Sequence, residues 1–366
     1  MTTSPLFTPL AIGSMTLKNR FVRSATWEGL AGDDGSVTER LCGLIDNVAA
    51  GELGMIISGH AFVSREGQAG PWQLGIYDDR LAAGLTELAT RMKRHGSAAV
   101  AQLAHAGGQA AQMLTGTQPV GPSPMTGRSG AAAREMTVAE ITQTVEAFAR
   151  AATRARTAGF DAVQLHGAHG FLLSQFLSPH FNRRTDGYGG DVAGRARFLL
   201  ETVAAVRAAV GPGYPILAKI NADDFLDDGF NVDHMIETCR MLQDASLDAV
   251  ELSGGTVADE SRYSSVRTGE PARPEEEVYY RKAAERFKKE VGLPLILVGG
   301  IRSFDVAERI ITDGLADAVA VSRPLIVEPG LVARWKSGDH GPSTCLSCNQ
   351  CFEPGMMGEG IRCVLE

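Results

Sequence analysis

Short apolar runs alternate along the chain with longer segments in which apolar residues recur every three or four positions. The short runs are bounded by small or polar residues and are β-prone, which favours buried strands. Each interval between them leaves room for a helix. The runs cover Phe21–Ala25, Met55–Ser58, Ala98–Leu103, Ala162–Leu165, Ile216–Ile220, Ala249–Leu252, Leu295–Val298 and Ala318–Val321.

The intervals carry helix signals. Thr137 and Glu140 have the spacing of a capping box, and the apolar residues after them follow helical periodicity. Ala284–Val291 and Phe304–Ile311 also predict helices. The segments AGFDAV, ASLDAV and DGLADAV each predict a helix end, a short loop and a buried strand. Repeated helix-to-strand units indicate an α/β fold.

Eight strands alternating with helices over 366 residues predict a single (β/α)8 TIM barrel. A doubly wound sheet is the alternative, but no G-x-G-x-x-G follows the first strand and no P-loop motif is present. We expect the barrel to span residues 1–337 and a short cysteine-rich extension to span residues 338–366.

Polar residues gather at the carboxyl ends of the predicted strands. They are Gln102, His166, Lys219, Ser253, Ser322 and Arg323. In a barrel these ends meet on one face, where barrel enzymes place their active sites. Gly299 and Gly300, beside Ser322 and Arg323 of the next strand, predict a phosphate site, because glycines let backbone amides approach an anion. A tight turn with a surface arginine is the alternative.

Charge and hydropathy exclude some partners. The net charge is −8 and no Lys/Arg-rich cluster is present, which argues against nucleic acid or an anionic membrane surface. No apolar run approaches the roughly 18 residues of a membrane helix, and the N-terminus has no secretory signal pattern. We therefore expect a cytoplasmic protein. We also expect it to act on a small molecule and to form a homo-oligomer.

Several longer motifs resemble the old yellow enzyme family of FMN-dependent NAD(P)H oxidoreductases. They are KNRFVRSAT, AQLAHAGG, LHGAHGFLLSQFLSPHFNRRTDGYGG with the GRARF that follows, and SRPL. The resemblance runs from LFTPLAIG near the N-terminus to VAVSRPLIVEPGL. It implies FMN at the carboxyl face of the barrel, with NADH or NADPH as the reductant.

The resemblance also implies which residues contact FMN. They are Ser24, Ala25, Thr26, Gly59, His60, Gln102, Lys219, Gly299, Gly300, Ser322 and Arg323. In this assignment Gln102 bonds the pyrimidine part of the flavin, and Lys219 supplies the positive charge near N1 and O2 that stabilises the reduced form. The last four residues hold the phosphate. A snorkelling or salt-bridged lysine is the alternative for Lys219.

His166 and His169 lie three residues apart in VQLHGAHG, and three interpretations are open. A metal site would need a third ligand, and no suitable partner stands near them. Two structural histidines at the edge of a core are the second interpretation. The resemblance implies the third, in which both donate N–H groups to the oxygen of a carbonyl, nitro or similar acceptor and polarise it for hydride attack.

Two positions depart from the family pattern. Phe171 stands where many members have a proton-donating tyrosine, so another group supplies that proton or the reaction needs none. Tyr263 and Tyr188 are candidates. Trp27 stands where some relatives carry a flavin-tuning cysteine. We expect Trp27, Phe171 and Tyr263 to contact the substrate.

Four of the six cysteines crowd the last residues of the chain. Cys345, Cys348, Cys351 and Cys363 follow the pattern C-x2-C-x2-C-x11-C, which suits one [4Fe–4S] cubane. Zinc more often uses two separated C-x2-C pairs, and disulfides or free thiols are further alternatives. The tail resembles the subgroup that includes bacterial 2,4-dienoyl-CoA reductase, although those relatives have one more residue between the second and third cysteines.

Those relatives also carry an FAD/NAD domain after the cluster, and this chain stops at Glu366. We therefore expect a cluster either to pass electrons to a separate electron-transfer protein or to be structural. We expect hydride transfer from NAD(P)H through FMN to an activated alkene or related electrophile, with ping-pong kinetics. One alternative is a flavin amine dehydrogenase or N-demethylase that sends electrons through the iron–sulfur centre. Another is a non-catalytic flavin-binding electron carrier.

Overall fold

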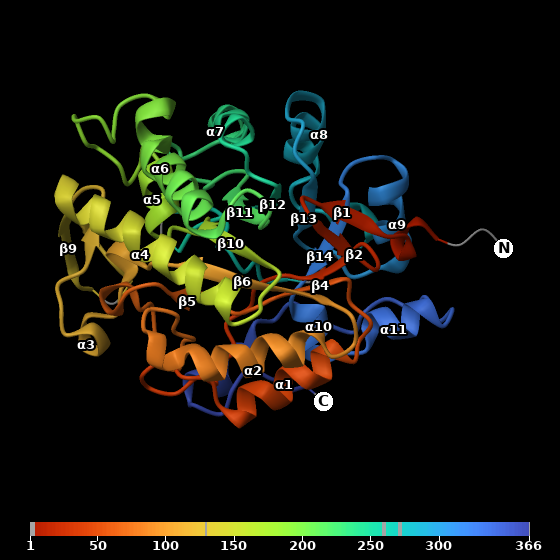
Figure 1. The fold of residues 1–366 in the computed structure, drawn as a ribbon. Helices are drawn as coiled ribbons and strands as arrows, with labels where there is room; N and C mark the ends of the chain where they lie inside the picture. Colours follow the sequence, from red (N-terminus) through yellow and green to blue (C-terminus); the bar gives the residue numbers. More distant parts are fainter. Residues whose placement is uncertain (1–3, 129, 258–260, 270–272, 366) are drawn as a thin grey trace.

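Eight parallel strands close into a barrel, and a helix follows each of them on the outside (Figure 1). The structure is a computed structural model that describes residues 4–128, 130–257, 261–269 and 273–365. Each strand pairs with the next in the chain, and the last pairs with the first. In order they are β3 (Phe21–Arg23), β4 (Met55–Ile57), β6 (Ala98–Ala104), β10 (Ala162–Gly167), β11 (Ile216–Asn221), β12 (Ala249–Ser253), β13 (Leu295–Val298) and β14 (Ala318–Val321).

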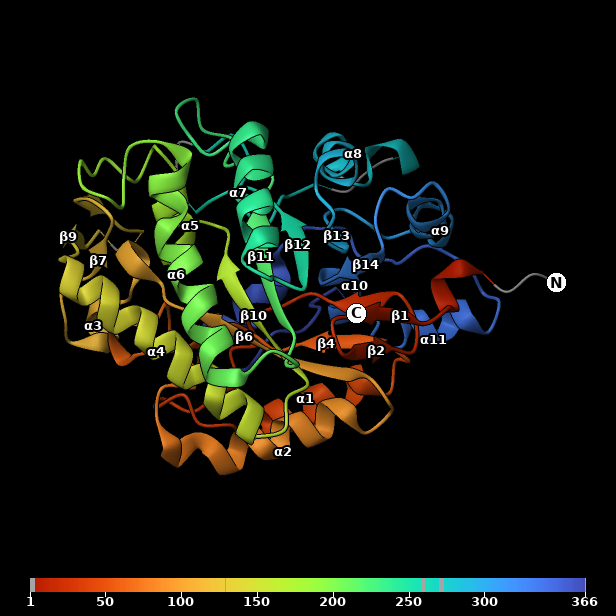
Figure 2. The same cartoon turned by 45° about the horizontal axis from the view of Figure 1, so that its top comes forward.

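The outer helices confirm the predicted alternation, and Figure 2 shows them around the strands from a second direction. Thr137 and Glu140 form the predicted capping box at the start of α4, and helices cover most of both other predicted segments. The helices that follow the strands are α1 (Glu39–Ala49), α2 (Ala82–Lys93), α4 (Val138–Thr157), α6 (Val192–Val210), α7 (Val232–Asp244), α8 (Arg281–Glu290), α9 (Phe304–Thr312) and, after the short α10 (Arg323–Val327), α11 (Leu331–Lys336).

The barrel has an apolar interior at the amino ends of its strands. Because successive side chains of a strand point to opposite faces, Ala98 and Val100 of β6 join an interior cluster, while Ala99 belongs to the outer core under the helices. The N-terminal hairpin, β1 (Leu10–Ile12) and β2 (Met15–Leu17), contributes to the same interior cluster. The hairpin therefore closes the amino end, and the carboxyl end is left for a site.

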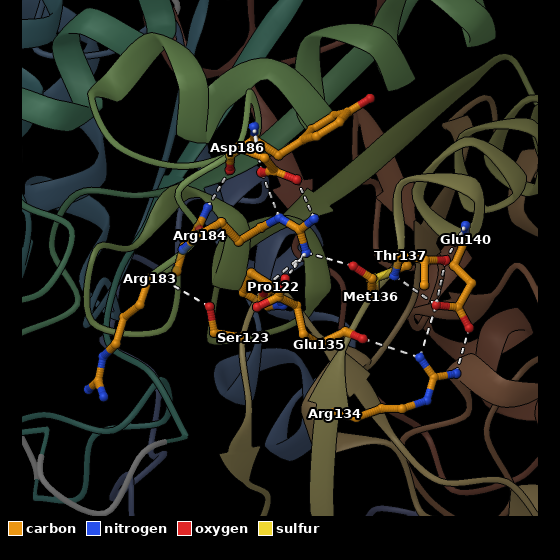
Figure 3. Close-up of polar contacts among 12 residues, drawn as sticks. Pro122, Ser123, Arg134, Glu135, Met136, Thr137, Glu140, Arg183, Arg184 and Asp186 are labelled. Atoms are coloured by element: carbon orange, nitrogen blue, oxygen red, sulfur yellow. Dashed lines mark hydrogen bonds and ion pairs between the residues drawn. The ribbon is translucent and has the colours of Figure 1, made fainter.

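An insertion between β6 and α4 forms a small sheet of β7 (Val120–Gly121), β8 (Met125–Thr126) and β9 (Ala132–Glu135). The second half of the longest motif, FNRRTDGYGG, follows the short helix α5 (Leu172–Leu177). Its Arg183 and Arg184 bond this insertion (Figure 3).

Arg184 is the centre of that contact. Its side chain is 3% exposed, and Nη1 donates to the carbonyl oxygens of Met136 at 2.6 Å and Pro122 at 3.2 Å (Figure 3). The Nε and Nη2 atoms donate to the two carboxylate oxygens of Asp186 at 3.0 and 2.6 Å. The arginine lowers the pKa of Asp186. This half of the motif therefore fixes a loop.

We expect Arg184→Met to lower the free energy of unfolding by about 2 kcal/mol, because buried carbonyls lose their donor and the carboxylate loses its partner. Urea denaturation of the apoprotein measures this. Arg183→Met is the matched control, since the Arg183 side chain is exposed and the recorded contact uses its backbone N–H. Equal stability of the two variants would contradict the structural role of Arg184.

Residues 338–365 run back over the carboxyl face and include α12 (Glu353–Met356). The Ser343 N–H donates to the Arg302 carbonyl, and the Ile361 N–H donates to the Glu28 carbonyl, both at 2.9 Å. The division of the chain after residue 337 stays a prediction. Within the described ranges, no helix combines the length and apolar character needed to cross a membrane.

Candidate functional site

A buried polar network fills the inward positions at the carboxyl ends of the strands. Register places Gln102 opposite Gln164, and Lys219 opposite Glu251. Gln102 donates to Gln164 at 2.7 Å, and Gln164 donates to Glu251 at 2.8 Å. The Lys219 Nζ atom donates to Glu251 at 3.1 Å and to Ser24 Oγ at 2.8 Å. Because each charge has a partner, a lysine and a glutamate can both be buried here.

The network bears on two sequence predictions. Lys219 is salt-bridged, as the alternative interpretation held, and it also lines the cleft described next. Gln164 and Glu251 were missed. Each is a polar residue within an apolar run, AVQLH or AVELS, that predicts a strand buried on both faces. A polar side chain in such a strand indicates a buried polar site.

A cleft lies over this network. Eight residues predicted to bind cofactor or substrate line it together, namely Ser24, Ala25, His169, Lys219, Gly299, Gly300, Ser322 and Arg323. Arg267, Arg302 and Ser253 line it as well. Arg267 and Arg302 were not predicted to join the site, because both lie outside the motifs that identify the family.

The glycine pair is required by close packing. The φ angles of Gly299 and Gly300 are +123° and +77°, which side chains rarely adopt. A Cβ on Gly299 would lie 2.7 Å from the Tyr280 ring, and one on Gly300 would lie 2.5 Å from the Tyr279 ring. Bare backbone therefore faces the cleft, next to arginine side chains, which suits an anion.

Thr26 and Gly59 lie beside the cleft. The Thr26 and Ser322 hydroxyls are 2.7 Å apart. The Gly59 N–H donates to Glu28 at 3.0 Å, and a Cβ on Gly59 would lie 2.0 Å from the same carboxylate. Burial raises the pKa of Glu28, and Arg23, 3.0 Å away, opposes that rise. This buried ion pair fixes the loop after β4.

Three histidines and one phenylalanine form an aromatic cluster at the edge of the cleft. The rings of His166 and His169 have centroids 5.3 Å apart, and His60 lies 6.2 Å from His166. Phe171 packs 4.6 Å from His166 and 5.2 Å from His60. The Nδ1 atom of His166 is buried and has no hydrogen-bond partner among the described atoms.

His169 is held in an unusual conformation. Its φ is +66°, and its N–H donates to the Asn221 side chain at 3.2 Å. The Nε2 atom lies 2.8 Å from Ser253 Oγ. Burial lowers the pKa of His166 and of His169 well below the usual value, and the charge of Lys219 adds to this effect. Burial lowers the pKa of His60 to about 4. The histidines are therefore neutral near pH 7.

The other predicted aromatic residues lie outside the wall of the cleft. Tyr263 is 46% exposed, and its ring packs against Phe225 at 5.0 Å. The Tyr188 hydroxyl donates to Glu201 at 2.9 Å. A Cβ on Gly355 would lie 2.8 Å from the Trp27 ring, so Trp27 packs on the C-terminal extension. None of the three lines the cleft within the described part of the chain.

Cys345, Cys348, Cys351 and Cys363 line one pocket in the extension. Arg323 and Cys345 also line the cleft over the polar network, so the two hollows adjoin. Burial raises the pKa of the Cys351 thiol to about 11, with Cys345 as the second cause. Across the residues that the structure describes, no three potential ligands converge on a single point as a metal ion would require.

Comparisons with known proteins match most of the chain to one family. Residues 5–340 match the model of the NADH:flavin oxidoreductase / NADH oxidase family. NADH oxidase of Thermoanaerobacter brockii is 39% identical over 364 residues, 98% of this chain and 54% of that protein. The 4,4'-dithiodibutanoate disulfide reductase of Rhodococcus erythropolis is 32% identical over 394 aligned positions, 100% of this chain and 96% of that protein.

Solved structures resemble the whole chain, including the extension. A 2-naphthoyl-CoA reductase complex has a TM-score of 0.91 and 26% identity, with 99% of this chain and 57% of that chain covered. Histamine dehydrogenase from Rhizobium sp. 4-9 has a TM-score of 0.84 and 28% identity, with 98% and 52% covered. The chain spans about half the length of several relatives that it matches.

Proposed function

Because the chain belongs to the NADH:flavin oxidoreductase / NADH oxidase family, also known as the old yellow enzyme family, we propose that it takes hydride from NADH or NADPH and passes it to an activated alkene or related electrophile. The disulfide reductase relative, which matches in length, favours the reductive direction. When bound, FMN would accept the hydride and donate it. We further propose that a homo-oligomer carries out this reaction in the cytoplasm.

The residues of the cleft fit FMN. Lys219 lines it, with Gln102 in the network beneath, and these would serve the polar edge of the ring. The backbone of Gly299 and Gly300 lines it as well, together with arginine side chains, and this would serve a phosphate.

The observation that carries the proposal is the unpartnered Nδ1 atom of His166. A buried polar atom without a partner costs about 1–3 kcal/mol, and an acceptor oxygen would remove that cost. His169 would be the second donor, oriented through its contacts with Ser253 and Asn221. Because both histidines are neutral, each can polarise an oxygen without surrendering a proton.

We expect the purified protein to be yellow, with absorbance near roughly 450 nm, and to release FMN on heating. Chromatography of the released cofactor distinguishes FMN from FAD. Anaerobic addition of NADPH or NADH should bleach the colour, and a later electrophile should restore it. A colourless protein that FMN cannot reconstitute would contradict the proposed cofactor and hence the reaction.

Amine oxidation is the second candidate. Phe171 has no hydroxyl, and neither Tyr263 nor Tyr188 lines the cleft to replace it. Reduction of an alkene needs a proton on carbon, whereas removal of hydride from an amine does not. The likeness to histamine dehydrogenase extends over the cysteine-containing tail. Anaerobic bleaching by a simple amine, but not by NAD(P)H, would favour this candidate.

We also propose that the four clustered cysteines bind one [4Fe–4S] cubane. All four line one pocket, and the spacing C-x2-C-x2-C-x11-C suits the corners of one cubane. Zinc is the alternative, and it would need four sulfurs within bonding distance of one ion. A cluster beside the flavin cleft suits electron exchange with a protein partner.

A further inference from the structure

Glu251 is a fully buried carboxylate, and none of the motifs that identify the family includes it. Register between β11 and β12 places it opposite Lys219, which lines the cleft. Burying a carboxylate is costly unless hydrogen-bond donors replace the lost water, whereas an apolar side chain would carry no such cost. The position of this charge therefore points to an effect on whatever occupies the cleft.

Three side chains donate hydrogen bonds to this carboxylate. Its Oε1 atom accepts from Ser24 Oγ at 2.6 Å and from Lys219 Nζ at 3.1 Å. Its Oε2 atom accepts from the Gln164 side chain at 2.8 Å. Two neutral donors and one ammonium suit an ionised carboxylate, so the network holds a negative charge beneath the cleft.

The ammonium of Lys219 is shared between this carboxylate and the cleft. Its side chain is 4% exposed, and Nζ donates to Ser24 Oγ at 2.8 Å as well as to Glu251. An ammonium has three N–H donors, so one remains for a ligand. Among the described residues that line the cleft there is no Asp or Glu, and Glu251 is the recorded ion-pair partner of Lys219.

The pair of Lys219 and Glu251 carries no net charge, and this limits what the lysine does for a bound flavin. Hydride transfer from NAD(P)H adds two electrons and one proton to the flavin and releases NAD(P)⁺. The occupied site thereby gains one negative charge. A lone lysine would stabilise that charge, and a carboxylate directly behind the lysine offsets much of the stabilisation.

We propose that Glu251 acts through Lys219 to lower the reduction potential of the bound flavin, which makes the reduced flavin a stronger hydride donor. Glu251 is a positioning residue in this role, because it contacts the lysine from beneath the cleft. The inference rests on the proposed FMN site and deepens the proposed reaction. A lower potential favours giving hydride to an electrophile over taking hydride from an amine.

Spectroelectrochemical titration of the FMN-loaded protein tests the proposal with wild type, Glu251→Gln and Glu146→Gln. We expect Glu251→Gln to strengthen binding of reduced relative to oxidised flavin about 10-fold, because one buried negative charge is lost. For a two-electron couple this is a rise of about 30 mV in midpoint potential. Glu146 is the matched control, since it is exposed on α4 beside Arg150, where solvent and salt screen its charge.

The double variant Lys219→Met/Glu251→Gln gives a second test, because it also leaves the pair without net charge. We expect Lys219→Met alone to weaken reduced relative to oxidised flavin about 10-fold. The double variant should lie within about 3-fold of wild type, since the two charge changes cancel. Replacing both partners of a buried ion pair is tolerated better than removing one, so this variant serves even if a single variant does not fold.

The sign of the shift separates tuning of the flavin from support of the lysine. If Glu251 only held Lys219 in place, Glu251→Gln would loosen the lysine, and the potential would fall or stay unchanged. Either result would overturn the proposal, as would a double variant whose potential is as low as that of Lys219→Met. Failure of wild type to bind FMN would overturn the FMN site and this inference with it, whereas a shift of the wrong sign would overturn the inference alone.

Discussion

Replacing both His166 and His169 with alanine should slow the oxidative half-reaction about 100-fold, the scale of losing hydrogen-bond donors to a developing negative charge. Reduction of the flavin by NAD(P)H should change much less, because it develops no charge on an acceptor oxygen. Anaerobic stopped-flow mixing of prereduced protein with cyclohexenone or a nitroalkene measures the first rate. Mixing oxidised protein with NADPH measures the second.

Two single variants sharpen the test. We expect His166→Ala to lose more than His169→Ala, because Nδ1 of His166 has no protein partner whereas Nε2 of His169 already bonds Ser253. His95→Ala is the matched control, since that side chain is exposed and far from the cleft in sequence and fold. A double variant with the wild-type oxidative rate would contradict the catalytic role and show that the two histidines are structural.

The pH dependence follows from the same burial. The pKa of both histidines lies well below the usual value, so neither gains a proton near neutrality. The oxidative rate should therefore stay level between about pH 6 and pH 8, the range in which an ordinary histidine would titrate. A fall centred near the ordinary histidine pKa that disappears in the double variant would mean that the pair donates as a cation.

The barrel could be predicted because each parallel strand is buried on both faces and reads as a continuous apolar run. The predicted run Leu295–Val298 is the strand β13 to the residue. Helix α8 begins at Arg281, before the predicted start at Ala284. Arg281 and Lys282 are polar, so the apolar periodicity from which the helix was predicted does not include its first turn. Boundaries of amphipathic helices depend on packing that the sequence does not state.

The site was only partly predictable. Strand ends identified Lys219 and Gln102, because barrel geometry brings such ends together whatever the loops do. Arg267 and Tyr279 lie in loops, and their approach to the glycine pair depends on tertiary contacts across the cleft. Trp27 was expected to contact the substrate. Its ring packs against Gly355, a contact between distant parts of the chain that the sequence does not reveal, and its contact with substrate stays a prediction. Cysteine spacing likewise predicted a shared site without giving its geometry.

Substituting Cys348 with serine should remove all bound iron and leave FMN in place. Anaerobically purified wild type should contain about four irons and four acid-labile sulfides per chain, with a broad shoulder near roughly 400 nm that bleaches on reduction. Cys348 is exposed at the pocket that the other three cysteines share. A cubane that loses one thiolate corner is left open to solvent and to oxidation.

Retention of FMN follows from the separation of the two sites along the chain. Every residue expected to bind FMN precedes residue 324, and the cysteines begin at Cys345. Cys42→Ala is the control, because Cys42 is buried in α1 and should not affect iron content. Iron, zinc and sulfide are measured by elemental and colorimetric analysis of the same samples. One zinc per chain without sulfide would contradict the cluster and indicate a structural zinc site. Metal-free protein would contradict both metal sites and leave only thiols or disulfides.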